Sequence, residues 1–478
     1  MGQKMAQDTM ERMNWQALLN TERPGKPGQA EDPGRPNYTQ DADRITFSAP
    51  FRRLANKTQV HPLYANDHLR HRMIHSSEVA SVGRNLGMQV GHWLEQQKEI
   101  AAGEAHKVAG IIHAAALAHD IGNPPFGHSG EATIGAWFER QFAKSEGIFK
   151  GVDESLWEEF TKFEGNAQGY RILTRLEMYR GDRGMDLSHA VIGAFTKYPM
   201  SAATSAALKA EEVEKGTPKK DVKKKLYAGA KKFGFFESER EIFAKTAKAL
   251  GLLEEQGPKA QTWWRRHPLV FLVEAADDIC YNIVDLEDGF SAGDLTFAEV
   301  RGLLLDLIED KRNTDNAPKE VYTEHTDYEQ ISHLRARAIG ASIGACVEAF
   351  KENYDAIMTG TYSGELIDDS KLGAKFRAIR ELAGSQLFTA PRKTKLEVRG
   401  RNVICAVLDG ILPVYTSLKD ADWDEGALPD YERQLVRAIS LDLRGINSNY
   451  EALHAMADFV SGMTDRYAVE VAELVSGR

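Results

Sequence analysis

The pattern of apolar positions along the chain is helical almost throughout. Apolar residues recur at spacings of three and four, the period of a helix with one buried face. Ten segments show this pattern: 74–98, 107–120, 129–145, 165–181, 187–197, 238–254, 267–286, 296–311, 328–358 and 447–475. No long stretch alternates apolar and polar residues as a half-buried strand does. The sequence therefore predicts an all-α fold.

The remaining segments suggest how the chain is organised. Residues 17–44 contain four prolines and predict an extended lead-in before the helices begin. No internal repeat is evident. We expect an N-terminal extension over 1–40, a helical core over 41–290, and further helices over 291–478 that pack on this core.

The composition is that of an ordinary globular protein. Of the 478 residues, 42% are hydrophobic and 27% are charged. No run of eighteen apolar residues predicts a membrane span, and the first residues lack the apolar stretch of a secretory signal. Three widely spaced cysteines predict neither a disulfide framework nor a cysteine-based zinc site. We therefore expect a cytoplasmic protein without membrane association.

The charge balance limits the kinds of partner. A net charge of −10 argues against a protein whose whole surface binds nucleic acid. The segment 215–232 is an exception, because it contains eight lysines. Two hypotheses fit this run: a solvated surface segment, and a segment that binds phosphate or a polynucleotide.

The segment 267–286 places a carboxylate on an apolar helix face. Asp277 is in phase with Val273, and Tyr281 and Asp285 follow it by four and eight residues on the same face. Burying a carboxylate without a partner is costly, so Asp277 needs a metal ion, a cation or several hydrogen-bond donors. The alternative is a salt bridge on the helix surface.

The segment 72–90 places an imidazole on a buried stripe. His75 is in phase with Val79 and Val82. A hydrogen-bonded core histidine is the alternative to a ligand at such a position. Arg72 shares this face one turn earlier, and an arginine beside a buried imidazole suggests that an anion lies between them.

A third helix, rich in alanine, ends at a His-Asp pair. Gly122 and the two prolines after Asn123 stop this helix just after His119 and Asp120. Side chains that project from a helix end can both reach one ion. The loop then leads to His128, and Glu131 follows one turn later, so its carboxylate can orient the imidazole.

These residues together form a set suited to a metal ion. Two imidazoles and two carboxylates fit a divalent first-row metal with water positions left open: His75, His119, Asp120 and Asp277. Other histidines offer the same chemistry, namely His61, His68, His71 and His113. Spacing alone does not decide which of them converge.

Longer stretches of the sequence carry a resemblance over nearly the whole chain. They are DRITFSAPFRRLANKTQV (43–60), HSSEVASVGR (75–84), AHDIGNPPFGHSGEA (118–132), FEGNAQGYRIL (163–173), TKYP (196–199), EAADDICYNIVDLEDG (274–289) and SGMTDRYA (461–468). In this order and wording they resemble the HD-domain deoxynucleoside triphosphate triphosphohydrolases, specifically the bacterial deoxyguanosinetriphosphate triphosphohydrolases (dGTPases). The resemblance implies an HD-domain helical core with additional C-terminal helices.

The resemblance also implies a metal centre of the pattern H…HD…D, on His75, His119, Asp120 and Asp277. Asp277 is preferred to Asp278 because the family pattern places a tyrosine and an aspartate four and eight residues after the metal aspartate. Mn²⁺ or Mg²⁺ is the expected ion, with Fe, Co or Zn as alternatives. His128 is implied as the catalytic histidine, acting as acid or base, and Glu131 as its orienting carboxylate.

The implied reaction is hydrolysis of dGTP to deoxyguanosine and inorganic triphosphate, by attack of water at the α-phosphorus. By similarity, the nucleotide contacts are Gln59, Arg72, Asn166, Lys197, Tyr198, Tyr281 and Asp285. Family members are commonly homo-oligomers, often hexamers, and some respond to nucleotides or single-stranded DNA. Three alternatives remain: a broader dNTP triphosphohydrolase, an HD phosphodiesterase, and a nucleotide- or DNA-binding regulator with an inactive site.

Overall fold

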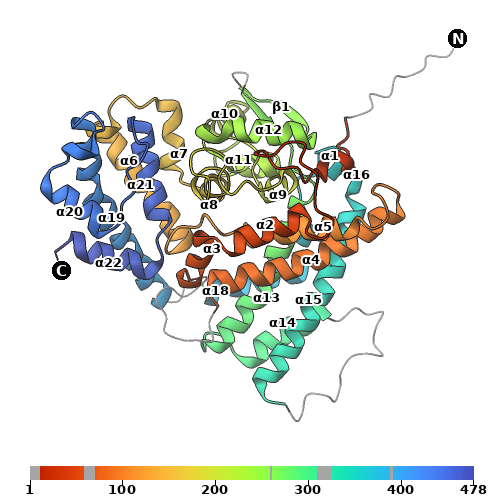
Figure 1. Ribbon diagram of the computed structural model, residues 1–478. Coiled ribbons are helices and arrows are strands. Elements are labelled where there is room, and N and C mark those ends of the chain that lie inside the picture. The colour runs from red at the N-terminus through yellow and green to blue at the C-terminus, as the bar shows by residue number, and fades with distance from the viewer. Residues whose placement is uncertain (1–10, 59–69, 259–260, 309–324, 388–390, 478) are drawn as a thin grey trace.

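The computed structural model describes residues 11–58, 70–258, 261–308, 325–387 and 391–477. Helices make up almost all of the regular structure in these ranges, which confirms the predicted all-α fold. One short antiparallel hairpin joins strand β1 (Glu254–Gln256) to strand β2 (Thr262–Trp264). Figure 1 shows the helices gathered into two groups, which correspond to two hydrophobic clusters.

The first cluster, here called the first core, contains most of the helices between residues 15 and 386. At its centre α4 packs against α5, and α13 packs against both α4 and α15. Its helices are α1 (Trp15–Leu18), α2 (Asn37–Thr46), α3 (Ala49–Arg53), α4 (Arg72–Gln96), α5 (Ala105–Ala118), α9 (His189–Phe195), α12 (Arg240–Leu250), α13 (Val270–Ser291), α14 (Phe297–Ile308), α15 (Asp327–Glu352), α16 (Tyr354–Met358), α17 (Leu366–Asp369) and α18 (Gly373–Gln386).

The second cluster, here called the second core, joins the C-terminal helices to two helices from the first third of the chain. Its helices are α6 (Gly127–Lys144), α7 (Trp157–Thr161), α19 (Pro391–Asp420), α20 (Asp430–Ala438), α21 (Asn449–Ser461) and α22 (Asp465–Val475). Figure 1 shows this group at one side of the molecule. Helix α8 (Gly165–Arg171) lies between the two cores, because Tyr170 is buried in the first core and Ala167 is buried in the second.

Two further helices, α10 (Ala202–Glu214) and α11 (Val222–Lys225), lie near the hairpin. The two cores interleave along the sequence, because α6 and α7 belong to the second core while α14 to α18 belong to the first. The expected division into residues 1–40, 41–290 and 291–478 stays a prediction.

Several element predictions differ from the structure. The extended lead-in over 17–44 is wrong at its end, where α2 begins directly after Pro36, whose φ of −54° suits the start of a helix. The segment 328–358 contains two helices separated at Asn353, and 447–475 is interrupted by Gly462 to Thr464. The segment 165–181 is α-helical only to Arg171, and a π-helical turn follows over Ile172–Leu176.

Ten of the described helices lie outside the predicted segments: α1, α2, α3, α7, α10, α11, α17, α18, α19 and α20. Of the described helices, one stretch of α19, Thr394–Asp420, is long and apolar enough to cross a membrane by length and composition. Several of its apolar residues, such as Ile404, Val407 and Leu408, are fully buried in the second core, whereas Val398 is exposed. This burial is that of a core helix in a globular protein.

Small residues set the distance between α4 and α5. Gly83, Gly87 and Gly91 recur every four residues on the face of α4 that meets α5. A Cβ atom added at Gly87 would lie 2.8 Å from the Cα of Ala109, and one at Gly91 would lie 2.7 Å from the Cα of Ala105. The backbones of the two helices are therefore close enough to exclude any side chain at these positions.

We expect Gly87→Ala to lower the free energy of unfolding by about 1–3 kcal/mol, because its methyl group would overlap the backbone of α5. The matched control is Gly340→Ala on α15, where an added Cβ meets no described atom within 4 Å. That control should raise stability by about 0.4–1 kcal/mol. Urea unfolding of both variants checks the prediction, and equal stability of the two would contradict it.

Candidate active site

A cavity of about 380 Å³ opens where the two cores meet. The first core contributes side chains from α4, α5 and α13, and the second core contributes α6 and α19. The lining residues are Thr58, Arg72, His75, His119, Asp120, Asn123, Phe126, Gly127, His128, Ser129, Glu131, Asn166, Ala194, Phe195, Lys197, Tyr198, Lys232, Val270, Val273, Glu274, Asp277, Tyr281 and Glu397. Its size is that of a small-molecule site.

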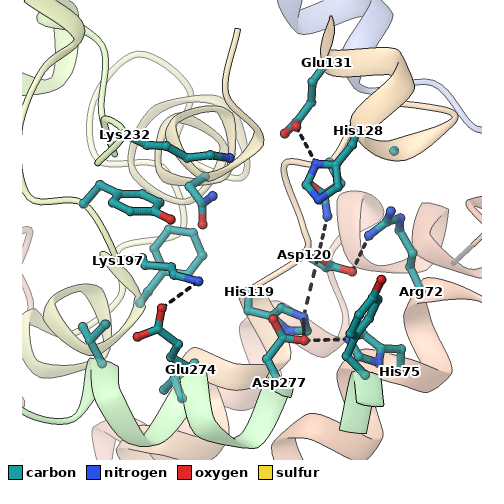
Figure 2. A pocket seen from close by; sticks show the side chains of 18 of the residues that line it. Arg72, His75, His119, Asp120, His128, Glu131, Lys197, Lys232, Glu274 and Asp277 are labelled. Atoms are coloured by element: carbon teal, nitrogen blue, oxygen red, sulfur yellow. Dashed lines mark hydrogen bonds and ion pairs between the residues drawn. The ribbon is translucent and has the colours of Figure 1, made fainter. Parts of the chain in front are cut away.

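Three of the expected metal ligands converge at the base of this cavity. The ligand atoms of His75, His119 and Asp277 all lie within 4.8 Å of one another. The Nε2 of His75 is 3.0 Å from Oδ1 of Asp277, and the Nε2 of His119 is 3.6 Å from the same oxygen. The start of α4, the end of α5 and the distant helix α13 therefore direct these groups to one point (Figure 2).

The environment of His119 suits a metal ligand. Its Nδ1 lies 2.7 Å from the carbonyl oxygen of Ala116, which can only accept, so Nδ1 carries the proton. The lone pair is then on Nε2, which is buried and makes no hydrogen bond among the described residues. A backbone carbonyl that orients a histidine in this way is a common feature of metal sites. The residues present thus fit a divalent cation.

The fourth expected ligand, Asp120, lies beside the cluster and is engaged by other groups. Its Oδ1 is 3.6 Å from Nε2 of His119 and accepts a hydrogen bond from Asn123, while Oδ2 accepts one of 2.6 Å from Arg72. Burial alone would raise the pKa of Asp120, but the charges of Arg72, His119 and His75 together outweigh burial and lower the pKa. Asp120 therefore stays ionised at the cluster.

The two neighbouring aspartates of α13 differ in their electrostatic surroundings. Burial would raise the pKa of Asp277, but His119 and the hydrogen bond from His75 outweigh burial and lower it. Burial and the nearby carboxylate of Glu274 raise the pKa of Asp278 well above its usual value. The ionised form, which a metal ion needs, is thus favoured at Asp277 and disfavoured at Asp278.

His128 and Glu131 form a hydrogen-bonded pair on α6. The imidazole is 88% exposed, and its Nδ1 lies 2.7 Å from Oε2 of Glu131. This hydrogen bond raises the pKa of His128. The other oxygen of Glu131 accepts a 2.8 Å bond from the amide of Gly165, where an added Cβ would lie 2.7 Å from that oxygen. Because residue 165 is a glycine, the backbone of α8 can approach Glu131 and hold its carboxylate through this hydrogen bond.

Two lysines face the metal-ligand cluster from the other side of the cavity, opposite Arg72 (Figure 2). Lys197 forms a 2.9 Å ion pair with Glu274, and Lys232 forms a 2.7 Å ion pair with Glu164. Burial would raise the pKa of Glu274, but Arg266 and Lys197 lower it to about 2. Both ammonium groups are thus fixed in direction by a carboxylate.

The predicted nucleotide contacts are distributed as follows. Five of them line the cavity: Arg72, Asn166, Lys197, Tyr198 and Tyr281. Asp285 is buried on α13 and is not among the described lining residues, and Gln59 lies outside the described residues.

Two of the four other histidines that could have been metal ligands lie in the described part of the chain, and neither belongs to the cluster. His71 accepts a hydrogen bond at the start of α4, and the Nδ1 of His113 lies 3.2 Å from the carbonyl of Ala80. His61 and His68 lie outside the described residues.

Sequence reasoning missed three lining residues of interest: Lys232, Asn123 and Glu397. Lys232 is the last residue of the lysine-rich segment 215–232, so the hypothesis that this segment binds phosphate was the signal that could have identified it. Asn123 lies in the loop whose glycine and prolines predict only the end of a helix. Glu397 comes from α19, a helix that the apolar pattern did not predict, and no motif marks it.

Comparisons with known proteins agree with this geometry. A family model described as "HD domain" matches residues 72–215. A deoxyguanosinetriphosphate triphosphohydrolase-like protein of Pseudomonas aeruginosa (strain LESB58) is 36% identical over 98% of this chain and 99% of its own length. A protein of the same description from Synechocystis sp. is 34% identical over 97% of this chain and 99% of its own.

A deoxyguanosinetriphosphate triphosphohydrolase of Yersinia enterocolitica is 27% identical over 96% of this chain and 98% of its own length. Because similarity at 36% identity extends over nearly the full length, the chain belongs to the deoxyguanosinetriphosphate triphosphohydrolase family of HD-domain proteins.

Proposed function

We propose that this protein hydrolyses dGTP to deoxyguanosine and inorganic triphosphate in a reaction that depends on a divalent metal ion. One observation carries the proposal: a single cavity brings together a cluster of ligand type (His75, His119 and Asp277), a histidine–carboxylate pair, and three cationic side chains. These are the groups that cleavage of a phosphate ester needs. A broader use of dNTPs is the alternative within the same reaction class.

The proposed metal ligands are His75, His119, Asp120 and Asp277, with Mn²⁺ or Mg²⁺ as the expected ion. When bound, such an ion lowers the pKa of water and offsets negative charge on phosphate oxygens. Arg72 donates a hydrogen bond to Asp120, one of the proposed ligands, and also lines the cavity that would hold the substrate.

Arg72, Lys197 and Lys232 are the proposed triphosphate-binding groups. A triphosphate chain is a polyanion, and charge-assisted hydrogen bonds to it are stronger than neutral ones. Each lysine has three N–H donors, so an ion pair with one carboxylate leaves donors for phosphate oxygens. The ring of Tyr281 lines the same cavity and offers an apolar face to the sugar or base.

His128 is the proposed proton-transfer residue. Departure of the 5′-oxygen of deoxyguanosine needs a proton, and attack of water releases one. Because Nδ1 of His128 is bound to Glu131, the second ring nitrogen is the one that can exchange a proton with substrate or water. The reaction breaks the bond between the α-phosphorus and the 5′-oxygen, and the water oxygen joins the triphosphate.

Other properties stay predictions from the sequence and its resemblance. They are the preference for dGTP over other dNTPs, a homo-oligomeric assembly such as the hexamer common in the family, regulation by a nucleotide or single-stranded DNA, and a cytoplasmic location. Turnover measured separately with each of the four dNTPs decides the first of them.

The products test the reaction class. Incubation of the protein with dGTP and Mn²⁺ or Mg²⁺ should give deoxyguanosine and inorganic triphosphate, observed by phosphorus NMR. In water labelled with ¹⁸O, the label should appear in the triphosphate and not in deoxyguanosine. Release of dGMP with pyrophosphate, or of dGDP with phosphate, would assign the protein to another reaction class.

The ligand assignment is tested on neighbouring aspartates. Asp277→Asn should reduce the affinity for the metal ion at least about tenfold, because an amide lacks the negative charge that the cation needs. Asp278→Asn is the matched control, since burial already favours a neutral group there and metal content should persist. Elemental analysis of the two variants provides the measurement, with circular dichroism to check helix content. Metal loss from only the Asp278 variant would reverse the assignment.

The proton-transfer role of His128 is tested on the pair with Glu131. His128→Ala should lower kcat by roughly a hundred- to ten-thousand-fold, the usual contribution of a positioned acid or base. Metal content and dGTP affinity should hardly change, because other elements supply the ligands and the cations. If the residue only stabilises the first turn of α6, the melting temperature would fall and kcat would stay within a few-fold of wild type.

The same pair predicts a shift in pH dependence. Glu131 raises the pKa of His128, so Glu131→Gln should lower that pKa. The limb of the kcat–pH profile that reports His128 should then move to lower pH, whether the residue acts as acid or base. Glu139→Gln, at an exposed position of the same helix, is the matched control and should leave the profile in place. An unmoved limb in the Glu131 variant would contradict this coupling.

A further inference from the structure

We infer that Lys57 and Asp465 position the loop that carries His128, so that the C-terminal helices α21 and α22 set the geometry of proton transfer. Lys57 and Asp465 are here called the loop clamp. The inference rests on the proposed function, because it assumes that His128 acts in the reaction. Neither residue was assigned a role by the sequence motifs in which it stands, 43–60 and 461–468.

The loop after Asp120 connects the two halves of the active site. It leaves the end of α5 at the expected metal ligands and enters α6 at Gly127, directly before His128. Phe126 in this loop has a φ of +63°, a left-handed conformation that is rare for a bulky residue. Such a conformation costs free energy and persists only where the surroundings hold it in place.

Asp465 holds the loop at Phe126. This carboxylate is 2% exposed, and its Oδ1 accepts a 3.0 Å hydrogen bond from the amide of Phe126. Its Oδ2 accepts bonds from the amide of Thr58, at 3.2 Å, and from the hydroxyl of Thr58, at 2.6 Å. Asp465 is the first residue of α22, where the helix dipole also favours a negative charge.

Lys57 holds the same loop three residues earlier. Its ammonium group is buried and donates to the carbonyl of Asn123, at 2.6 Å, and to the carbonyl of Ser461, at 2.7 Å. Ser461 is the last residue of α21, so one side chain joins the loop to the C-terminal helices. Asn123 in turn donates to Asp120, which places the clamp one residue away from an expected metal ligand.

A third contact comes from the side chain of Phe126 itself. The ring is buried in the second core, and an added Cβ at Gly400 of α19 would lie 2.7 Å from it. The imidazole of His128, by contrast, is largely exposed and has one described hydrogen bond, to Glu131. The direction in which His128 points therefore depends on the backbone that the loop clamp holds.

The side chains of the clamp make no described hydrogen bond to α4, to α13 or to the lysines of the cavity, and reach a proposed ligand only at Asp120, through Asn123. The backbone carbonyl of Lys57 also accepts a 3.0 Å bond from the amide of Arg72 at the start of α4, and a change of the Lys57 side chain leaves that bond in place. Loss of the clamp should therefore disturb proton transfer more than binding. A displacement of about 1 Å in a reacting group can cost a factor of about 100 in rate. A residue that served only to join the two cores would instead change stability alone.

The test uses Asp465→Ala and Lys57→Met in the full-length protein. Each should lower kcat roughly ten- to a hundred-fold, while KM and metal content change by less than about threefold. Hydrogen exchange of the peptide that spans residues 121–128 should become faster in both. Asp465→Asn keeps one acceptor oxygen and should retain more of kcat than Asp465→Ala.

Asp41→Asn is the matched control. Asp41 is also fully buried and accepts bonds from the amide and the hydroxyl of one residue, Ser188, but it lies in the first core away from the cavity. This variant should lower the melting temperature without changing kcat or the exchange of the loop. It therefore separates a loss of stability from a loss of positioning.

Two results would overturn the inference while leaving the proposed function intact. One is faster exchange of the loop with kcat within twofold of wild type, which would make the clamp purely structural. The other is unchanged exchange of residues 121–128 in both variants of a protein that remains active. If the wild-type protein hydrolysed no dNTP, the proposed function would fail and the inference with it. Lys57→Met keeps the test decisive should Asp465→Ala fail to fold.

Discussion

The close packing of α4, α5 and α13 is the constraint on which the active site depends. Gly83 of α4 lies where the three helices meet, and an added Cβ there would lie 2.9 Å from Ile112 and 3.6 Å from Ala276. Ala276 directly precedes Asp277, and the rings of His75 and His119 are 5.2 Å apart between centroids. Larger residues at this crossing would separate the helices and, with them, the three ligand-type side chains.

Burial of ionisable groups around the cavity is balanced by specific partners. Arg72 pairs with Asp120, Lys197 with Glu274, and Lys232 with Glu164. Removing a charge from water costs several kcal/mol unless an opposite charge or hydrogen bonds replace the water. The pairs keep cations and carboxylates ionised within one small cavity, and this mixture suits a ligand that carries phosphate groups together with a metal ion.

The cavity lies between two hydrophobic cores, and each core supplies a different part of the chemistry. The first core holds the ligand-type cluster, whereas the second core holds α6 with His128 and Glu131. The distance between the ligand-type cluster and the pair of His128 and Glu131 is thus a property of how the cores are joined. Lys57 and Asp465 join them at the loop itself, through hydrogen bonds between the loop and the C-terminal helices.

The sequence by itself determined the all-α fold class, the positions of most long helices and the candidate ligands, because helical periodicity and the polar residues that interrupt it are local properties. It also indicated the pair of His128 and Glu131, since their separation of three residues places them together on any helix. It failed where structure depends on distant contacts. Helix α19 carries a polar first half and Pro413, and its apolar face becomes recognisable only against α6 and α22.

Only the tertiary structure decided which histidines converge, how Asp277 differs from Asp278, and which residues hold the loop before His128. These facts depend on the crossing of helices separated by up to four hundred residues, as in the contact between Lys57 and Ser461. Sequence spacing specifies neighbours along one helix and carries no information about the angle at which two helices meet. The packing of side chains determines that angle, because overlapping atoms exclude all but a few arrangements.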